Sequence, residues 1–170
     1  MARMKKQTDK KKTALRVILW LLVLVWMGLI FSFSAETAVE SSQSSGSLIR
    51  RLLAFFDPGF RDLDAAEQKA MIESLDFFVR KAAHFSIFTA LGLLTAAAYS
   101  VDFSPRAAFL LALLTGALYA VSDEVHQAFV PGRACQLRDM IIDACGTTLG
   151  ACFFTAMRLL HRRRKNKPNE

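Results

Sequence analysis

The sequence contains little proline, glycine or cysteine: four, eight and three residues out of 170. This scarcity excludes a collagen-like repeat and argues against a disordered low-complexity chain. Cys135, Cys145 and Cys152 show no CxxC or Cys/His ligand spacing, so we expect them to be packing residues rather than a disulfide framework. The apolar runs also lack the period-two alternation of outer-membrane strands. Hydrophobic residues make up 53% of the chain, which indicates an integral membrane protein with helical spans.

Four apolar runs have the length expected of bilayer-spanning helices. We predict spans over residues 17–33, 81–101, 104–122 and 139–160. The first run follows a basic tail, as in a signal peptide, and Ser32–Ala35 would offer small residues for cleavage. Its length and its two tryptophans favour a retained anchor instead. The predicted fold class is therefore an all-α membrane protein with four transmembrane helices.

The charge distribution predicts the orientation of the spans. Lys and Arg total 22 against 15 Asp and Glu, and many of them lie in the tails 1–16 and 161–170. By the positive-inside rule both termini are expected in the cytoplasm, so residues 34–80 and 123–138 face outward. Because the basic residues lie mostly outside the apolar runs, we expect the lipid bilayer and not nucleic acid as the partner.

The connection over residues 34–80 is expected to contain more than loop. Its serine-rich stretch, residues 41–47, is typical of a flexible linker. Residues 48–56 and 64–81 have the spacing of amphipathic helices, with Asp57-Pro58-Gly59 between them. We predict an extracytoplasmic amphipathic segment that lies in the headgroup layer or packs over the bundle.

Polar residues from three predicted spans converge at the outer face. Ionisable side chains inside spans are costly and mark candidate functional sites. The candidates for acid–base chemistry are His84, Glu124 and His126. The candidates for ligand binding are Lys81, Asp123, Gln127, Arg133, Asp139 and Asp143, and the structural candidates are Pro131, Gly132, Gly146 and Gly150.

The last predicted span carries a stripe that should face the bundle interior. Asp139, Asp143, Gly146 and Gly150 are separated by four, three and four residues, and the two glycines form a GxxxG. The alternative is assembly alone, with Asp139 capping the helix and Asp143 paired to Arg133 or Lys81.

A second expectation concerns the two preceding spans. They are joined by a short turn, so they should be antiparallel neighbours. That arrangement would bring His84 to the depth of Glu124, and we predict that these two side chains form a pair. Pro131-Gly132 should form a tight turn that directs Arg133 back to the bundle.

The ordered series Lys81-x-x-His84-Phe85, Asp123-Glu124-x-His126-Gln127-x-Phe129-x-Pro131-Gly132-Arg133, and Asp139 with Asp143 resembles the VanZ-like family. Phe31-Ser32-x-Ser34 is also similar to that family. The resemblance implies a multi-pass protein of the bacterial cytoplasmic membrane. Its naming member is linked with teicoplanin resistance, whereas no biochemical activity follows from the resemblance.

Three hypotheses for function remain. The first is binding or modification of an anionic envelope ligand, such as a phosphorylated lipid carrier or a cell-wall precursor, with Lys81 and Arg133 as cations. The second is metal binding, which the sequence disfavours because Glu-x-His is not a zincin spacing; we expect no metal and no cofactor. The third is a non-catalytic structural or interaction protein. Turnover and homo-oligomerisation are left open.

Overall fold

The computed structural model describes residues 2–165, and over these residues the chain is helical without strands. It contains α1 (Ala2–Ser34), α2 (Ala38–Phe56), the 3₁₀ turn η1 (Pro58–Arg61), α3 (Ala65–Tyr99), α4 (Pro105–Gln127) and α5 (Leu137–Lys165). Four helical stretches are long and apolar enough to cross a membrane: Asp9–Ser34, α3, α4 and α5. The predicted fold class, all-α with four membrane-spanning helices, is confirmed.

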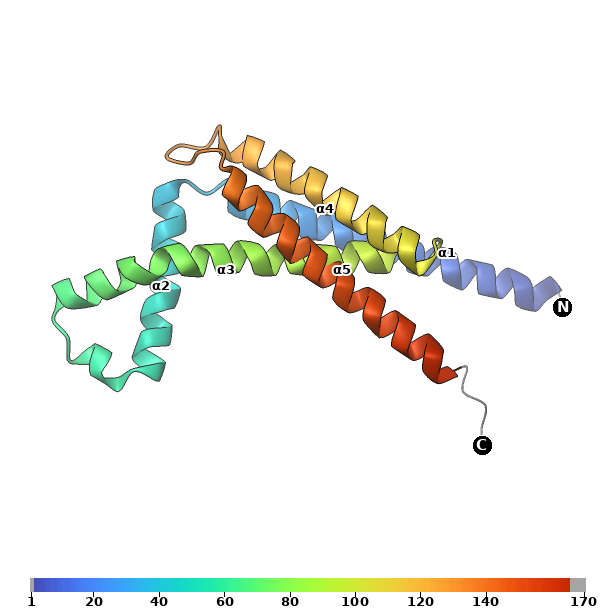
Figure 1. Cartoon of the computed structure of the whole chain (residues 1–170), viewed down its shortest axis with the longest axis horizontal. Coiled ribbons are helices and arrows are strands. Elements are labelled where there is room, and N and C mark those ends of the chain that lie inside the picture. The colour runs from blue at the N-terminus through green and yellow to red at the C-terminus, as the bar shows by residue number, and fades with distance from the viewer. Residues whose placement is uncertain (1, 166–170) are drawn as a thin grey trace.

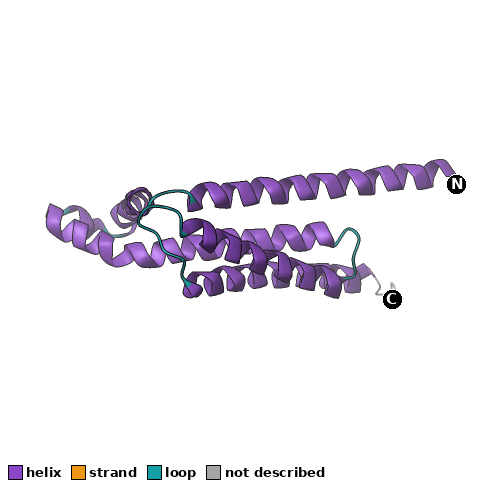
Figure 2. Cartoon of the chain, turned by 90° about the horizontal axis from the view of Figure 1, so that it is seen from above, coloured by secondary structure: helices purple, strands orange, loops and turns teal. Residues whose placement is uncertain are grey.

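The four long helices lie side by side in an elongated bundle (Figure 1). The start of α1 and the end of α5 lie at one end of this bundle. The opposite end, which we call the loop end, carries the connection from α4 to α5. There α2 runs across the bundle, and the N-terminal part of α3 extends past it. From above, α1 lies along one side of the other three spans (Figure 2).

The α3–α5 pair is the most extensive helix contact, and small residues make it close. Ala96, Ala112 and Ala151 form a buried cluster that joins α3, α4 and α5. Gly146 and Gly150 are buried, and their backbones lie against the α3 carbonyls of Phe85 and Thr89. Helices associate in membranes through such small-residue contacts because apolar surface alone gives little preference over lipid. The predicted stripe on α5 therefore faces the interior.

Polar side chains fasten α1 to the rest of the bundle. The Trp26 indole donates to the Ile87 carbonyl at 2.8 Å, and the Tyr119 hydroxyl donates to the Met27 carbonyl at 2.6 Å. Each hydrogen bond gives a partner to a polar group that would otherwise lie unpaired in the hydrocarbon layer. Around them Val23, Ile30 and other apolar side chains form a buried cluster.

A further polar contact holds α1 at the end opposite the loop end. Arg16 makes two hydrogen bonds to the Asp102 carboxylate, at 2.7 and 2.5 Å. These bonds lower the pKa of Asp102, and Lys12 adds a weaker attraction at 3.4 Å. The short turn between α3 and α4 is therefore tied to the first helix.

The prediction of a flexible linker over residues 41–47 is wrong, because this stretch lies inside α2. Thr37 and Glu40 form a capping box that starts the helix. Ser42 donates to Asp76 of α3 at 3.2 Å, and the Ser45 hydroxyl also donates to this carboxylate. Packing against α3 thus overrides the low helix preference of the serines.

The amphipathic segment 64–81 and the predicted second span form one continuous helix, α3. Asp64 caps its N-terminus and forms a capping box with Glu67. Nothing interrupts the helical backbone between this segment and the apolar run. The predicted boundary at residue 81 therefore marks a change in polarity and not a break in the helix. The side of the membrane that this segment faces stays a prediction.

Candidate functional site

All four spans contribute polar side chains to the loop end. These residues lie where α1 ends, about midway along α3, and next to the connection between α4 and α5. Asp123, Glu124, Gln127, Asp139 and Asp143 are all buried. Buried polar groups of this number need partners or a bound species. The loop end is therefore the candidate site.

Asp123 is held in place through one of its two carboxylate oxygens. Its Oδ2 accepts hydrogen bonds from the Ser34 hydroxyl at 2.8 Å and from the Gln127 amide at 2.9 Å. Ser34 belongs to α1 and is fully buried. The other oxygen, Oδ1, is buried and has no hydrogen-bond partner among the described residues.

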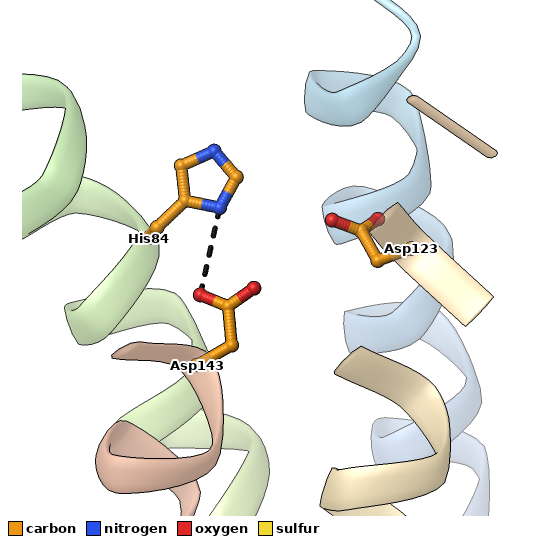
Figure 3. Close-up of side chains that lie close together, drawn as sticks. All are labelled: His84, Asp123 and Asp143. Atoms are coloured by element: carbon orange, nitrogen blue, oxygen red, sulfur yellow. Dashed lines mark ion pairs between the residues drawn. The ribbon is translucent and has the colours of Figure 1, made fainter. Parts of the chain in front are cut away.

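His84, Asp123 and Asp143 come together from α3, α4 and α5 (Figure 3). His84 Nδ1 lies 3.6 Å from Asp143 Oδ1. One nitrogen or oxygen atom from each residue lies within 4.8 Å of the others. Asp143 is fully buried, and neither of its oxygens has a hydrogen-bond partner among the described residues.

A second charged group lies nearby on the same helices. The Lys81 ammonium forms an ion pair with Asp139. Arg138 lies 3.8 Å from the same carboxylate and stacks over the Phe77 ring. Asp139 therefore pairs with two cations, whereas His84 is the only basic side chain among the described residues within 4.0 Å of Asp143, on the next turn of α5.

The predicted pairing of His84 with Glu124 is wrong. Glu124 Oε2 instead accepts a hydrogen bond from the Gln136 backbone N–H at 2.8 Å. Asp123 and Glu124 are adjacent on α4 and so point about 100° apart, and it is Asp123 that reaches His84. The predicted antiparallel contact between α3 and α4 is present, so the error lies in the rotation of α4.

His126 lies apart from the other two candidates for acid–base chemistry. Its ring stacks on Phe31 of α1, with centroids 4.2 Å apart. Within the described residues it has no acidic side chain within ion-pair distance. The structure therefore does not bring His84, Glu124 and His126 together as one catalytic group.

The turn predicted at Pro131-Gly132 is present. The Arg133 N–H donates to the Val130 carbonyl at 3.1 Å, which closes a four-residue turn. Gly132 has φ of 76°, in the left-handed region that glycine adopts without strain. The turn places Arg133 beside the end of α1, where its guanidinium lies 3.4 Å from the Phe33 carbonyl. Burial lowers the pKa of Arg133.

Two adjoining cavities, each of about 410 Å³, lie at the loop end. Ser41, Arg80, His84 and Arg133 line both. The first is otherwise mostly polar and is lined by Lys81, Gln127, Gln136, Arg138 and Asp139, among others. The second is largely apolar and includes Phe33, Leu48, Val79, Ala83 and Ile87.

Sequence reasoning missed several residues that shape this region. Ser34 anchors Asp123, and Arg80 lines both cavities. Ser34 belongs to the Phe31-Ser32-x-Ser34 pattern, which was a usable signal. Gln136 contributes its backbone N–H to Glu124, and no side-chain pattern could have indicated that contact.

The fold and the site define a multi-pass helical membrane protein with a buried polar cluster at one end of its bundle. The model of the VanZ/LLP1 family matches residues 19–159, so the chain belongs to that family. The matched range includes every site residue described above. No curated protein and no solved structure matches the chain.

Proposed function

We propose that the protein binds an anionic ligand of the bacterial cell envelope at the loop end. The proposal rests on the environment of Arg133. Its guanidinium is half-buried, lines both cavities, and has no carboxylate within 4.0 Å among the described residues. Because a partly desolvated cation without a directly paired carboxylate is costly, a phosphate or carboxylate group would stabilise it, although Glu36 attracts it from farther away. The planar guanidinium can bind either group through two parallel hydrogen bonds.

The neighbouring cations are less available. Lys81 and Arg138 share Asp139. Arg80 pairs with Asp76 at 3.0 Å. Among the described Lys and Arg residues that line the polar cavity, Arg133 is therefore the one without a paired carboxylate.

The adjoining cavities favour an amphiphilic ligand. A charged head would occupy the polar cavity, and a hydrocarbon chain would occupy the apolar one, with Arg133 at their junction. Phosphorylated lipid carriers and lipid-linked cell-wall precursors have this chemistry. We propose binding rather than turnover, because Glu124 and His84, two of the acid–base candidates, form no hydrogen bond or ion pair with each other.

The cellular setting is part of the same proposal. The basic tails favour cytoplasmic termini, so the loop end would face outward from the bacterial cytoplasmic membrane. The teicoplanin resistance linked with the naming family member is consistent with such a role.

Binding of a polyprenyl phosphate tests the proposal, with the neutral polyprenol as the matched ligand. We expect purified protein in mild detergent to bind the phosphate and not the alcohol in native mass spectrometry. Arg133→Ala should weaken binding by about 10- to 100-fold, the range expected for hydrogen bonds to a charged group. Arg133→Lys should also bind more weakly, because it loses the planar fork.

Arg106→Ala is the matched control, since this arginine is exposed at the other end of the bundle and should not affect binding. In cells, teicoplanin susceptibility should follow the same order of variants. Equal binding of phosphate and alcohol, or of Arg133→Ala and the wild-type protein, would contradict the proposal.

A structural role is the second candidate, and the contacts between helices support it. The bond from Ser34 to Asp123 joins α1 to α4, and the pair of Lys81 with Asp139 joins α3 to α5. If locking the bundle is their whole role, polyprenyl phosphate will not bind the wild-type protein. Ser34→Ala would then lower the unfolding temperature and have no ligand to affect.

A further inference from the structure

The cluster of His84, Asp123 and Asp143 has a chemistry that anion binding by Arg133 does not use. We propose that these three side chains bind a single divalent cation that accepts mixed nitrogen and oxygen ligands, such as Zn²⁺. The inference does not require the proposed function, because it rests on the ligand atoms of these three side chains and not on Arg133, although His84 also lines both cavities.

The distances suit a shared ion better than a hydrogen bond. His84 Nδ1 and Asp143 Oδ1 are 3.6 Å apart, which is too long for a direct hydrogen bond. Two ligands at about 2.1 Å from one tetrahedral Zn²⁺ lie about 3.4 Å from each other. The ligand atoms of all three residues lie within 4.8 Å of one another, so a small movement brings each to a common ion.

The buried oxygens supply the second argument. Both oxygens of Asp143 and Oδ1 of Asp123 are buried without a hydrogen-bond partner among the described residues. Asp143 is 0% exposed and Asp123 is 3% exposed. Within these residues, no Lys or Arg lies within 4.0 Å of either carboxylate. Two buried carboxylates without counter-charge are strongly unfavourable, and a divalent cation balances both.

The surroundings are arranged as metal sites usually are. Ser34 and Gln127 hold Oδ2 of Asp123, while Oδ1 is buried without a hydrogen-bond partner among the described residues. Such bonds orient ligating carboxylates and affect metal affinity. Three protein ligands leave a coordination position for water or an anion. Imidazole and carboxylate together suit Zn²⁺ better than Mg²⁺ or Ca²⁺, which prefer oxygen.

Metal binding is tested on the full chain, purified in mild detergent with a tag that contains no histidine. After removal of metal with a chelator, Zn²⁺ is titrated by calorimetry and bound metal is measured by mass spectrometry. We expect a single ion per chain and a higher unfolding temperature with Zn²⁺ than with chelator. Asp143→Asn, Asp123→Asn and His84→Gln should each weaken binding by more than about 10-fold.

Asp139→Asn is the matched control, because it removes a buried carboxylate one turn away that is paired with Lys81 and lies outside the cluster. It should keep wild-type affinity for Zn²⁺. Ser34→Ala provides a test if the variants that lack a metal ligand fail to fold. It leaves all three metal ligands in place and should weaken Zn²⁺ binding by about 10-fold, because it removes a hydrogen bond that orients Asp123. Absence of Zn²⁺ uptake by the wild-type protein, or equal affinities of Asp143→Asn and Asp139→Asn, would overturn the proposal.

Discussion

Replacing Gly150 by alanine should destabilise the bundle by forcing α5 away from α3. A Cβ at this position would lie 2.8 Å from the Leu93 backbone nitrogen and closer still to the Thr89 carbonyl oxygen. Ordinary contacts begin near 3.4 Å, so the Leu93 contact alone requires the helices to separate by about 0.6 Å, and the closer Thr89 contact requires more. The obstacle is backbone, which cannot rotate out of the way as a side chain could.

The expected magnitude follows from two opposing effects. Overpacking of a close interface costs about 1–3 kcal/mol, and a separation of this size also weakens the dispersion contacts along α3 and α5. Alanine recovers up to about 1 kcal/mol through its higher helix propensity. We expect a net loss of about 2 kcal/mol in the free energy of unfolding, measured by SDS titration in detergent micelles and followed by helical circular dichroism.

Gly28→Ala is the matched control on α1. Nothing lies within 4 Å of a Cβ added there, so only the helix propensity changes. This variant should be neutral or stabilised by up to about 1 kcal/mol. If Gly150→Ala proves as stable as Gly28→Ala, the close backbone contact between α3 and α5 does not hold the bundle together, and the reasoning is refuted.

Two further predictions concern orientation and pH. In a variant without the native cysteines, an impermeant thiol reagent applied to intact cells should label a single cysteine substituted for Ser44 or Gln136, but not one substituted for Arg164. The reverse pattern would show that the bundle has the opposite orientation in the membrane. Because hydrogen bonds from Arg16 lower the pKa of Asp102, their stabilisation is present at neutral pH and is lost as pH falls through that lowered pKa. The unfolding temperatures of wild type and Asp102→Asn should therefore converge in acid below about pH 4, and a constant difference would contradict this reading.

The helical spans could be predicted because hydrophobic runs of bilayer length have few other outcomes. The convergence of polar residues at one end followed from the same reasoning, since alternating spans bring alternate helix ends together. The burial of Asp143, Gly146 and Gly150 also followed from their spacing on one helical stripe. These features depend on period and connectivity, and both are readable in a single sequence.

Contacts that depend on helix rotation could not be predicted in the same way. Asp123 and Glu124 are neighbours in the chain, and only the packing of α4 decides which one meets His84. Along the chain, the Glu-x-His spacing does not resemble a zincin motif. In the structure His84, Asp123 and Asp143 come from three helices, so no local motif could have indicated their proximity.

The error over residues 41–47 has a different cause. Serine-rich composition suggests flexibility, yet Thr37-x-x-Glu40 is a capping-box sequence and was available as a helix signal. The contact that fixes the helix, from Ser45 to Asp76, spans 31 residues and depends on the return path through η1. Local composition thus gave less information here than the pattern at the helix start.

Because α3 is uninterrupted, its helical rise gives the depth of each of its residues in the membrane. At about 1.5 Å per residue, the stretch from Lys81 to Tyr99 measures about 27 Å, close to the thickness of a bilayer's hydrocarbon layer. The preceding stretch from Ala65 adds about 24 Å, which a bilayer core cannot also contain. With Tyr99 at one hydrocarbon boundary, Arg80 and Lys81 would lie close to the other, and His84, about 22 Å from Tyr99, would lie just inside it. A lipid ligand could then slide sideways into the cavities from its own leaflet, without its head group crossing hydrocarbon or its tail crossing water.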